Sequence, residues 1–384
     1  MNFSFMQHVR IWEEPGALDR LGELMRQCGH ARAFLVCDSG IVSLGMADRA
    51  IQAIRKEGFT ATLYDRVRPD PAADIIDAGA ELCRSEGCDC VIALGGGSSI
   101  DVGKGVNILR NNPGHILDYA TGSRVMRPSP GLVAIPTTAG TGSELSNGLI
   151  VTDPATGVKV PILAVNGMAE YAVLDASLTL GLPPTITALT GLDVFSHVCE
   201  SSMSVLACEL TDIVCEKAMT DVVAFLPRAV ADGRDMAVRR RMLSLAAIGG
   251  WMLACASAHI GHSFAHVLGA KHHLPHGLAC AWSLPAAFDF LAESQTPKIR
   301  RIGEILGARF DGAESPRAVA EKTSEAYGGF CASLGVRPPS LPPLDESDLA
   351  ATAESIAREP LAALCPRRAE AETIKPLLAR LYGL

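Results

Sequence analysis

The first half of the chain alternates short apolar runs, rich in β-branched residues, with segments whose apolar positions recur at helical spacing. The runs predict buried strands, and the spaced patterns predict amphipathic helices between them. The predicted strands are 33–38, 61–65, 90–94 and 132–136, and the predicted helices are 46–58 and 71–87. Because strands separated by helices are typical of a parallel, doubly wound sheet, we expect a Rossmann-like α/β domain.

The second half of the chain has a different pattern. Beyond about residue 182 the strand-like runs fade, and long helical patterns continue to the C-terminus. Pro183 and Pro184 mark the change, since proline suits a break or the first turn of a helix. We therefore expect an α/β plus all-α protein of two domains, with residues 1–181 forming the α/β domain and residues 182–384 an all-helical domain.

The composition excludes several classes of protein. The 384 residues are 48% hydrophobic and 20% charged, as in globular rather than disordered chains. A net charge of -8 disfavours nucleic acid or an anionic membrane as a partner, and no apolar run reaches the roughly 18 residues of a membrane helix. The N-terminal residues lack the basic and apolar blocks of a signal peptide, so we expect a cytoplasmic protein.

The twelve cysteines do not indicate a disulfide framework in a chain of this length. The tightest group is Cys83, Cys88 and Cys90, and no second pair downstream would complete a zinc site. We expect reduced thiols that are mostly buried.

Two loops that follow predicted strands are candidates for phosphate binding. In "GGGSSIDVGKG", at 95–105, three glycines let backbone N–H groups approach an anion, and the start of a helix favours negative charge. "TTAGTGSE", at 137–144, ends a second strand. Two such loops at the carboxyl ends of parallel strands predict a dinucleotide site, although the first matches neither GxGxxG nor GxxxxGK[ST]. An ordinary strand-to-helix turn is the alternative.

Asp38 ends the first predicted strand. A carboxylate there accepts hydrogen bonds from the adenosine ribose hydroxyls and repels a 2′-phosphate, which favours NAD over NADP. The spacing is equally compatible with a turn or helix-capping aspartate.

Six of the ten histidines lie in the stretch "AHIGHSFAHVLGAKHHLPHG". His262 and His266 are four residues apart, on one face of a predicted helix, and His276 follows after a turn. Asp193 and His197 have the same spacing of four in an earlier segment. The carboxylate of Asp193 and the imidazoles of His197, His262 and His276 predict a divalent metal site that is open on one side.

The motifs "GGGSSIDVGK", "TTAGTGSE", "GLDVFSHVCE" and "GHSFAHVLGAKHHLPHG", in this order and spacing, resemble the iron-dependent (group III) alcohol dehydrogenase family. The resemblance spans almost the whole chain and implies a dinucleotide-binding domain followed by a helical metal-binding and catalytic domain. The metal ligands that it implies are Asp193, His197, His262 and His276. The dinucleotide-site positions that it implies are Asp38, Gly95, Gly96, Gly97, Ser98, Asp101, Thr137, Thr138 and Lys159.

The resemblance also implies the chemistry. A bound Fe²⁺ would polarise an aldehyde carbonyl or stabilise an alkoxide, while hydride passes between the substrate carbon and NAD(H). The catalytic histidines would be His262, as a ligand, and His266, as a proton relay. We expect a short-chain primary alcohol or its aldehyde as the substrate, Zn²⁺ as the alternative ion, and a homodimer.

Residues near the ligands depart from the family pattern at Cys255, His259 and Lys271. His259 and Lys271, together with His272 and His273, would give the substrate pocket more positive charge than a simple alcohol requires. This indicates a substrate with an anionic tail, such as a carboxylate, sulfonate or phosphonate. The alternative is that Lys271 extends to solvent and the histidines only support the ligands.

Other interpretations of the same motifs stay open. A glycerol dehydrogenase or a dehydroquinate synthase shares the fold, but His262 and "TTAGTGSE" fit the alcohol dehydrogenases better. Maleylacetate reductase is disfavoured because the metal motif is complete. A non-catalytic metal-binding protein would leave the glycine-rich loop unexplained.

Overall fold

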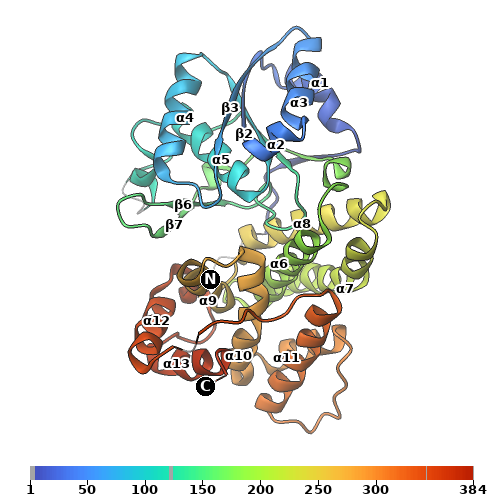
Figure 1. Cartoon of the computed structure of the whole chain (residues 1–384), viewed down its shortest axis with the longest axis vertical. Coiled ribbons are helices and arrows are strands. Elements are labelled where there is room, and N and C mark those ends of the chain that lie inside the picture. Colours follow the sequence, from blue (N-terminus) through green and yellow to red (C-terminus); the bar gives the residue numbers. More distant parts are fainter. Residues whose placement is uncertain (1–4, 121–123, 343, 384) are drawn as a thin grey trace. The chain divides into compact units, whose positions relative to one another are not determined.

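The structure, a computed structural model, describes residues 5–120, 124–342 and 344–383. It divides into two compact units (Figure 1). One unit comprises Gln7–Gly181, and the other comprises Leu182–Leu384 together with Phe5 and Met6.

A six-stranded parallel sheet forms the centre of the first unit, in the order β1-β8-β5-β4-β2-β3. The strands are β1 Arg10–Glu13, β2 Arg32–Asp38, β3 Thr60–Val67, β4 Cys90–Gly95, β5 Leu132–Pro136 and β8 Tyr171–Leu174. The four strands predicted from the sequence are β2, β3, β4 and β5. Strands β1 and β8 were not predicted, because each has only four residues and so short a run carries little periodicity.

Helices cover both faces of this sheet, as Figure 1 shows. Helices α1 (Leu21–Cys28) and α3 (Met46–Lys56) share a buried cluster with alternate strand residues such as Leu35. Helices α4 (Ala73–Ser85) and α5 (Gly97–Asn111) cover the opposite face. These contacts confirm the expected doubly wound arrangement.

Close packing on the second face depends on glycine. A Cβ atom added at Gly103 of α5 would lie 2.4 Å from Cβ of Ala93 on β4. No larger residue fits there, and α5 therefore lies directly against the strand that leads into its own N-terminus.

Two further elements of this unit were not expected. Strands β6 (Gly148–Thr152) and β7 (Lys159–Leu163) form an antiparallel hairpin outside the main sheet. The short helix α2 (Ser39–Ser43) follows β2 directly.

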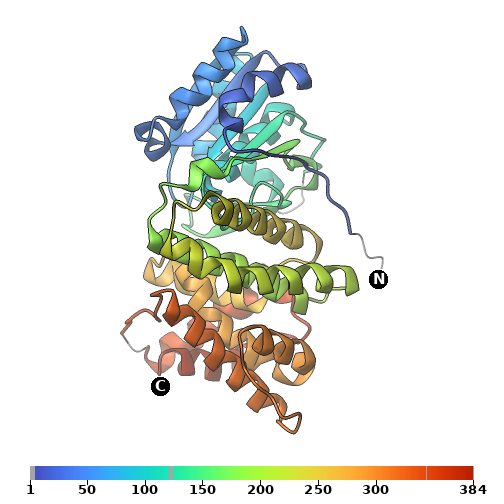
Figure 2. The ribbon, with the colours of Figure 1, turned by 90° about the vertical axis from the view of Figure 1, so that its right-hand side faces the viewer.

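The second unit is helical, and its described residues contain no strand. In Figure 2 its helices run in colour from green, at α6, to red, at α13. They are α6 Pro184–Met203, α7 Glu209–Ala231, α8 Met236–Cys255, α9 Ile260–His272, α10 His276–Ile305, α11 Pro316–Ser333, α12 Glu346–Arg358 and α13 Ala371–Leu381. The α/β plus all-α fold class is therefore confirmed.

The start of the helical unit is held by a buried arginine. Arg239 of α8 donates hydrogen bonds to the backbone oxygens of Leu182 and Gly233 and to Oγ1 of Thr187. Pro184 occupies the first position of α6, where the missing N–H has no helical partner in any case.

The N-terminal boundary differs from the expected range of 1–181. Phe5 packs against the ring of Trp251 with the ring centroids 4.9 Å apart, and the Trp251 indole donates to the backbone oxygen of Met6 at 2.9 Å. Phe5 and Met6 therefore belong with the helical unit. A hydropathy pattern cannot show this, because the contact joins segments about 245 residues apart in the sequence.

All twelve cysteines are free thiols, and nine of them are buried, as expected. Among the described residues, no single helix has the length and hydropathy to cross a membrane. Helices α8 and α9 satisfy that test only as a pair, which is bent by 108°.

Candidate active site

Three helices of the helical unit bring the four predicted metal ligands together. Asp193 and His197 lie one turn apart on α6, while His262 lies in the first turn of α9. His276 is the first residue of α10. Oδ1 of Asp193 lies 3.4 Å from Nε2 of His197 and 3.5 Å from Nε2 of His276. The same oxygen lies 3.9 Å from Nε2 of His262, so one carboxylate oxygen faces three imidazole nitrogens.

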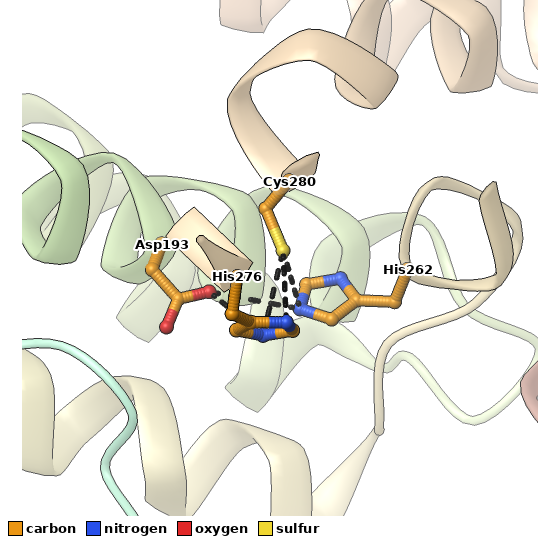
Figure 3. A group of neighbouring side chains, drawn as sticks. All are labelled: Asp193, His262, His276 and Cys280. Carbon is orange, nitrogen blue, oxygen red and sulfur yellow. Dashed lines mark hydrogen bonds and ion pairs between the residues drawn. The ribbon is translucent and has the colours of Figure 1, made fainter. Parts of the chain in front are cut away.

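Cys280 also belongs to this cluster, and the sequence analysis missed it. It follows His276 by one turn of α10, and Figure 3 shows its thiol pointing at His276 and His262. Sγ lies 3.5 Å from Nε2 of His276 and 3.6 Å from Nε2 of His262. One ligand atom from each of Asp193, His262, His276 and Cys280 lies within 4.8 Å of the others, and the predicted ligand His197 is not part of this group. The His276-x₃-Cys280 spacing, identical to that of Asp193 and His197, was the available signal.

The protonation states of Asp193, His197 and His276 suit a cation. The pKa of Asp193 is lowered, because the nearby imidazoles of His197, His276 and His262 outweigh the opposing effect of burial. Burial lowers the pKa of His197 to about 4, and the pKa of His276 is also lowered. The pKa of His262 is raised, because Cys280 and Glu200 outweigh the opposing effect of burial. An ionised carboxylate and neutral imidazoles are the forms that bind metals.

Two further observations fit a metal ion. Oδ1 of Asp193 is buried and has no hydrogen-bond donor among the described residues, an arrangement that is costly unless a cation lies nearby. The side chain of His276 is 41% exposed, whereas those of Asp193 and His262 are almost fully buried. The cluster is thus open on one side, as in catalytic rather than structural metal sites.

Glu200, on the last turn of α6, holds His262 in place. Its Oε1 lies 2.5 Å from Nδ1 of His262, and its Oε2 accepts the backbone N–H groups of His259 and Gly261 at 3.0 Å each. Burial alone would raise the pKa of Glu200, but His262 and His259 hold it at about 2. A carboxylate at Nδ1 leaves the Nε2 lone pair of His262 directed at the cluster. The sequence analysis did not single out this residue.

His266 lies beside the cluster, not within its tightest group. Its ring centroid is 5.7 Å from that of His276, and its Nδ1 lies 2.9 Å from Oε1 of Glu359. Glu359 also accepts a hydrogen bond from Oγ of Ser263 at 2.8 Å. Because Glu359 is 93 residues from His266 in the sequence, no spacing rule could have identified it.

The residues that were expected to add positive charge to the substrate pocket, and the other departures from the family pattern, contact other groups of the chain. Lys271 pairs with Asp348 at 3.4 Å, and Nε2 of His272 lies 2.6 Å from the hydroxyl of Tyr382. His259 is buried at the N-terminus of α9, where its Nδ1 accepts the N–H of Ile260. His273, with a φ of 53°, ends α9, and the thiol of Cys255 lies 3.7 Å from the backbone oxygen of Met6. These contacts involve other groups of the helical unit, and the substrate with an anionic tail stays a prediction.

In the α/β unit, the two predicted loops pack against each other. The N–H of Thr137 donates to the backbone oxygen of Gly95 at 3.0 Å. Gly95 has a φ of 148°, and a Cβ there would lie 2.5 Å from Oγ of Ser99. A Cβ at Gly96 would lie 3.6 Å from Oγ1 of Thr138, so the second loop is directly beside the glycines. Gly97 and Ser98 begin α5, whose free N–H groups suit a phosphate.

Asp38 caps the helix that follows β2. Its Oδ1 accepts the N–H groups of Gly40 and Ile41 at 2.7 and 3.1 Å, which makes it the N-cap of α2. Its Oδ2 faces the glycine-rich loop, where Ser99 donates to it at 3.4 Å. Asp38 is therefore a helix-capping residue, as the alternative interpretation of the sequence allowed. Hydrogen bonding of its Oδ2 to the adenosine ribose stays a prediction.

Asp101 and Lys159 have partners within the unit. Asp101 is buried and accepts hydrogen bonds from Oγ of Ser143 at 2.5 Å and the N–H of Ile150 at 3.1 Å, which joins α5 to the second loop and β6. Lys159 pairs with Asp70 at 2.6 Å. Their roles in binding a dinucleotide stay predictions.

Lys104 and Glu144 are buried charges that the sequence analysis did not identify. Lys104 Nζ donates to the backbone oxygens of Ser146 and Gly148 at 3.0 and 2.6 Å. Burial lowers the pKa of Lys104 to about 8 and raises that of Glu144 to about 7. One carboxylate oxygen of Glu144 has no hydrogen-bond partner among the described residues.

We expect Glu144→Gln to flatten the pH dependence of stability. The pKa of Glu144 is about 7 when folded and near 4.5 when unfolded, so the native state binds the proton more tightly. Its contribution is therefore present below pH 4.5 and lost as the pH rises through 7, by up to about 3 kcal/mol. Urea unfolding at pH 5 and pH 8 measures the difference. The exposed Glu86→Gln serves as a control, and an unchanged pH dependence in Glu144→Gln would contradict the expectation.

Comparison with known proteins identifies the family. The family model described as iron-containing alcohol dehydrogenase matches residues 9–176, and the model for the C-terminal part of the Fe-containing alcohol dehydrogenase family matches residues 187–382. The chain belongs to the iron-containing alcohol dehydrogenase family. The two matches together span both units, so the resemblance seen in the four motifs is confirmed.

Relatives within the family agree with this assignment. The chain is 30% identical over 321 residues to the NAD-dependent methanol dehydrogenase of Bacillus methanolicus, covering 84% of each chain. An alcohol dehydrogenase structure from Oenococcus oeni matches with a TM-score of 0.92 and 28% identity, covering 99% of this chain and all of the other. A sulfoacetaldehyde reductase from Bifidobacterium kashiwanohense, solved with NAD⁺, matches with a TM-score of 0.85 and 26% identity, covering 100% and 99%.

Proposed function

We propose that this protein is a metal-dependent NAD(H) oxidoreductase that interconverts a short-chain primary alcohol and its aldehyde. The observation that carries the proposal is the ligand cluster, in which an ionised Asp193 faces the imidazoles of His197, His262 and His276. Its open side at His276 leaves room for a substrate oxygen. Fe²⁺ is the ion expected from the family, and Zn²⁺ is the alternative.

The metal, when bound, supplies Lewis-acid stabilisation of the developing alkoxide. The chain's own residues hold and orient the reacting groups. Glu200 fixes the ring of His262, so that its Nε2 stays directed at the cluster. Glu359 holds Nδ1 of His266, which leaves the other ring nitrogen available to exchange the substrate proton with solvent.

The α/β unit would bind NAD(H) at its two packed loops. The N–H groups at Gly96, Gly97 and Ser98 would contact the phosphates at the N-terminus of α5. Thr137 and Thr138 border the same loop, and Oδ2 of Asp38 would accept hydrogen bonds from the adenosine ribose.

We propose an uncharged substrate rather than one with an anionic tail, because Lys271 pairs with Asp348 and His272 with Tyr382. The specific observation that favours the anionic alternative is the structural likeness to a sulfoacetaldehyde reductase.

The test measures NADH oxidation by anaerobically iron-loaded protein with propanal and with sulfoacetaldehyde. We expect a higher kcat/KM with propanal, in the wild type and in Lys271→Ala alike. Preference for sulfoacetaldehyde in the wild type, lost in Lys271→Ala, would instead establish the anionic substrate class. No turnover of any alcohol or aldehyde, despite bound metal, would favour a non-catalytic metal-binding protein.

Removing the Asp38 carboxylate is expected to shift the cofactor preference. Asp38→Gly removes the acceptor for ribose hydroxyls and the repulsion of a 2′-phosphate, so kcat/KM with NADPH rises relative to NADH. Because Asp38 also caps α2, this variant loses roughly a few tenths of a kcal/mol of stability. Asp38→Asn keeps the cap and loses only the charge, and it should shift the same ratio with little change in melting temperature. An unchanged ratio in both variants would leave Asp38 as a cap alone.

We also propose that the protein is cytoplasmic, that it forms a homodimer, and that it has no nucleic-acid or membrane partner. Light scattering coupled to size exclusion tests the dimer directly, and a mass of about 40 kDa would contradict it, since the chain itself has a mass of 40.4 kDa.

A further inference from the structure

The metal cluster contains a sulfur donor that the predicted ligand set does not include. Cys280 is only 2% exposed, and its Sγ lies almost equally far from the Nε2 atoms of His276 and His262, at 3.5 and 3.6 Å. In Figure 3 the thiol points at both rings.

The distances are those expected of atoms that share one ion. A zinc ion bonded to sulfur at about 2.3 Å and to imidazole nitrogen at about 2.05 Å separates the two donors by about 3.6 Å when the angle between the two bonds is about 110°. The two measured separations from Sγ agree with this value. The 3.5 Å from Oδ1 of Asp193 to Nε2 of His276 likewise suits two ligands of one ion.

The only other group of possible metal ligands found among the described residues is His30, Asp89 and Cys90. This group has no carboxylate oxygen that lacks a hydrogen-bond donor. Both carboxylate oxygens of Asp89 already accept backbone N–H groups, from Ala31 and Arg32 at 2.9 and 3.0 Å. Asp193, by contrast, directs an oxygen without a hydrogen-bond donor into the cluster that Cys280 joins.

We propose that Cys280 is a further metal ligand, and that its thiolate makes the site favour Zn²⁺ and Co²⁺ over Fe²⁺. The inference rests on the metal site of the proposed function. On binding, the S–H bond is replaced by an S–metal bond and the proton is released to water, with no change of oxidation state. Thiolate is a softer donor than carboxylate or imidazole, and soft donors select zinc over iron.

Cobalt substitution tests the proposal without measuring activity. Metal-free protein is loaded with Co²⁺, whose visible d–d bands report occupancy and whose near-ultraviolet charge-transfer band reports a bound thiolate. We expect both signals in the wild type. Cys280→Ala should keep the d–d bands and lose the charge-transfer band. Cys215→Ala, which changes an equally buried cysteine on α7, should keep both.

Metal competition provides a second readout. Dialysis against equal Zn²⁺ and Fe²⁺ under anaerobic conditions should load the wild type mainly with zinc. Cys280→Ala should lower the zinc-to-iron ratio by at least about tenfold. Cys280→Ser, a smaller change in volume, gives the same comparison if the alanine variant does not fold, as judged by circular dichroism.

The outcomes separate this proposal from the proposed function. Wild-type d–d bands without a charge-transfer band, or a charge-transfer band that persists in Cys280→Ala, would overturn the role of Cys280 and leave the metal site intact. Absence of any cobalt signal in the wild type would overturn the metal site, and the proposed function with it.

Discussion

His262→Ala is expected to abolish metal binding and activity together while the helical unit remains folded. His262 faces both Asp193 and Cys280 in the cluster, so its loss removes a central donor. Without the ion, several kcal/mol of transition-state stabilisation disappear, and kcat/KM falls by at least about a thousandfold. Metal content by elemental analysis, circular dichroism and steady-state kinetics measure the three quantities. We expect the same result for His276→Ala.

The matched control for this prediction is His272→Ala. His272 lies on the same helix but bonds to the hydroxyl of Tyr382, so its variant should retain the metal. If His262→Ala keeps full metal occupancy, then His262 is not a ligand.

Glu200→Ala is expected to weaken both the metal site and the fold. It removes the acceptor of two short backbone N–H contacts, from His259 and Gly261, and the partner of Nδ1 of His262. Each buried donor left without a partner costs about 1–3 kcal/mol, so a loss of several kcal/mol in the free energy of unfolding follows. Because His262 is no longer oriented, metal affinity falls by about 10–100-fold.

Two further variants distinguish orientation from stability. Glu200→Gln retains an acceptor oxygen, so it should recover part of the stability while metal affinity stays reduced. Glu216→Ala removes an exposed carboxylate on α7 that pairs with Arg301, and it should change stability by less than about 1 kcal/mol. Wild-type metal affinity in a folded Glu200→Ala would contradict the positioning role.

The sequence alone predicted the layered α/β unit. Buried parallel strands appear in a sequence as continuous apolar runs, and amphipathic helices appear as apolar residues that recur every three or four positions. It missed β1 and β8, which lie next to each other at one side of the sheet and have four residues each. Short strands are defined by the neighbour with which they pair, and that neighbour is not visible in a local pattern.

The sequence also predicted the members of the metal cluster that share a helix turn. Asp193 and His197 are one turn apart on α6, and this spacing follows from helix geometry alone. That His262 and His276 join them was implied by the family motifs, but it is the packing of α6, α9 and α10 that places their nitrogens within 4 Å of one carboxylate oxygen.

Only the tertiary structure decided which residues surround that cluster. Glu200, Cys280 and Glu359 were missed because their roles depend on which side chain faces which across helices, a relation that sequence spacing does not encode. The same holds for Lys271, whose charge indicated an anionic substrate until its contact with Asp348 gave it another partner. Local periodicity determines elements and their faces, whereas partners come from packing between elements distant in the chain.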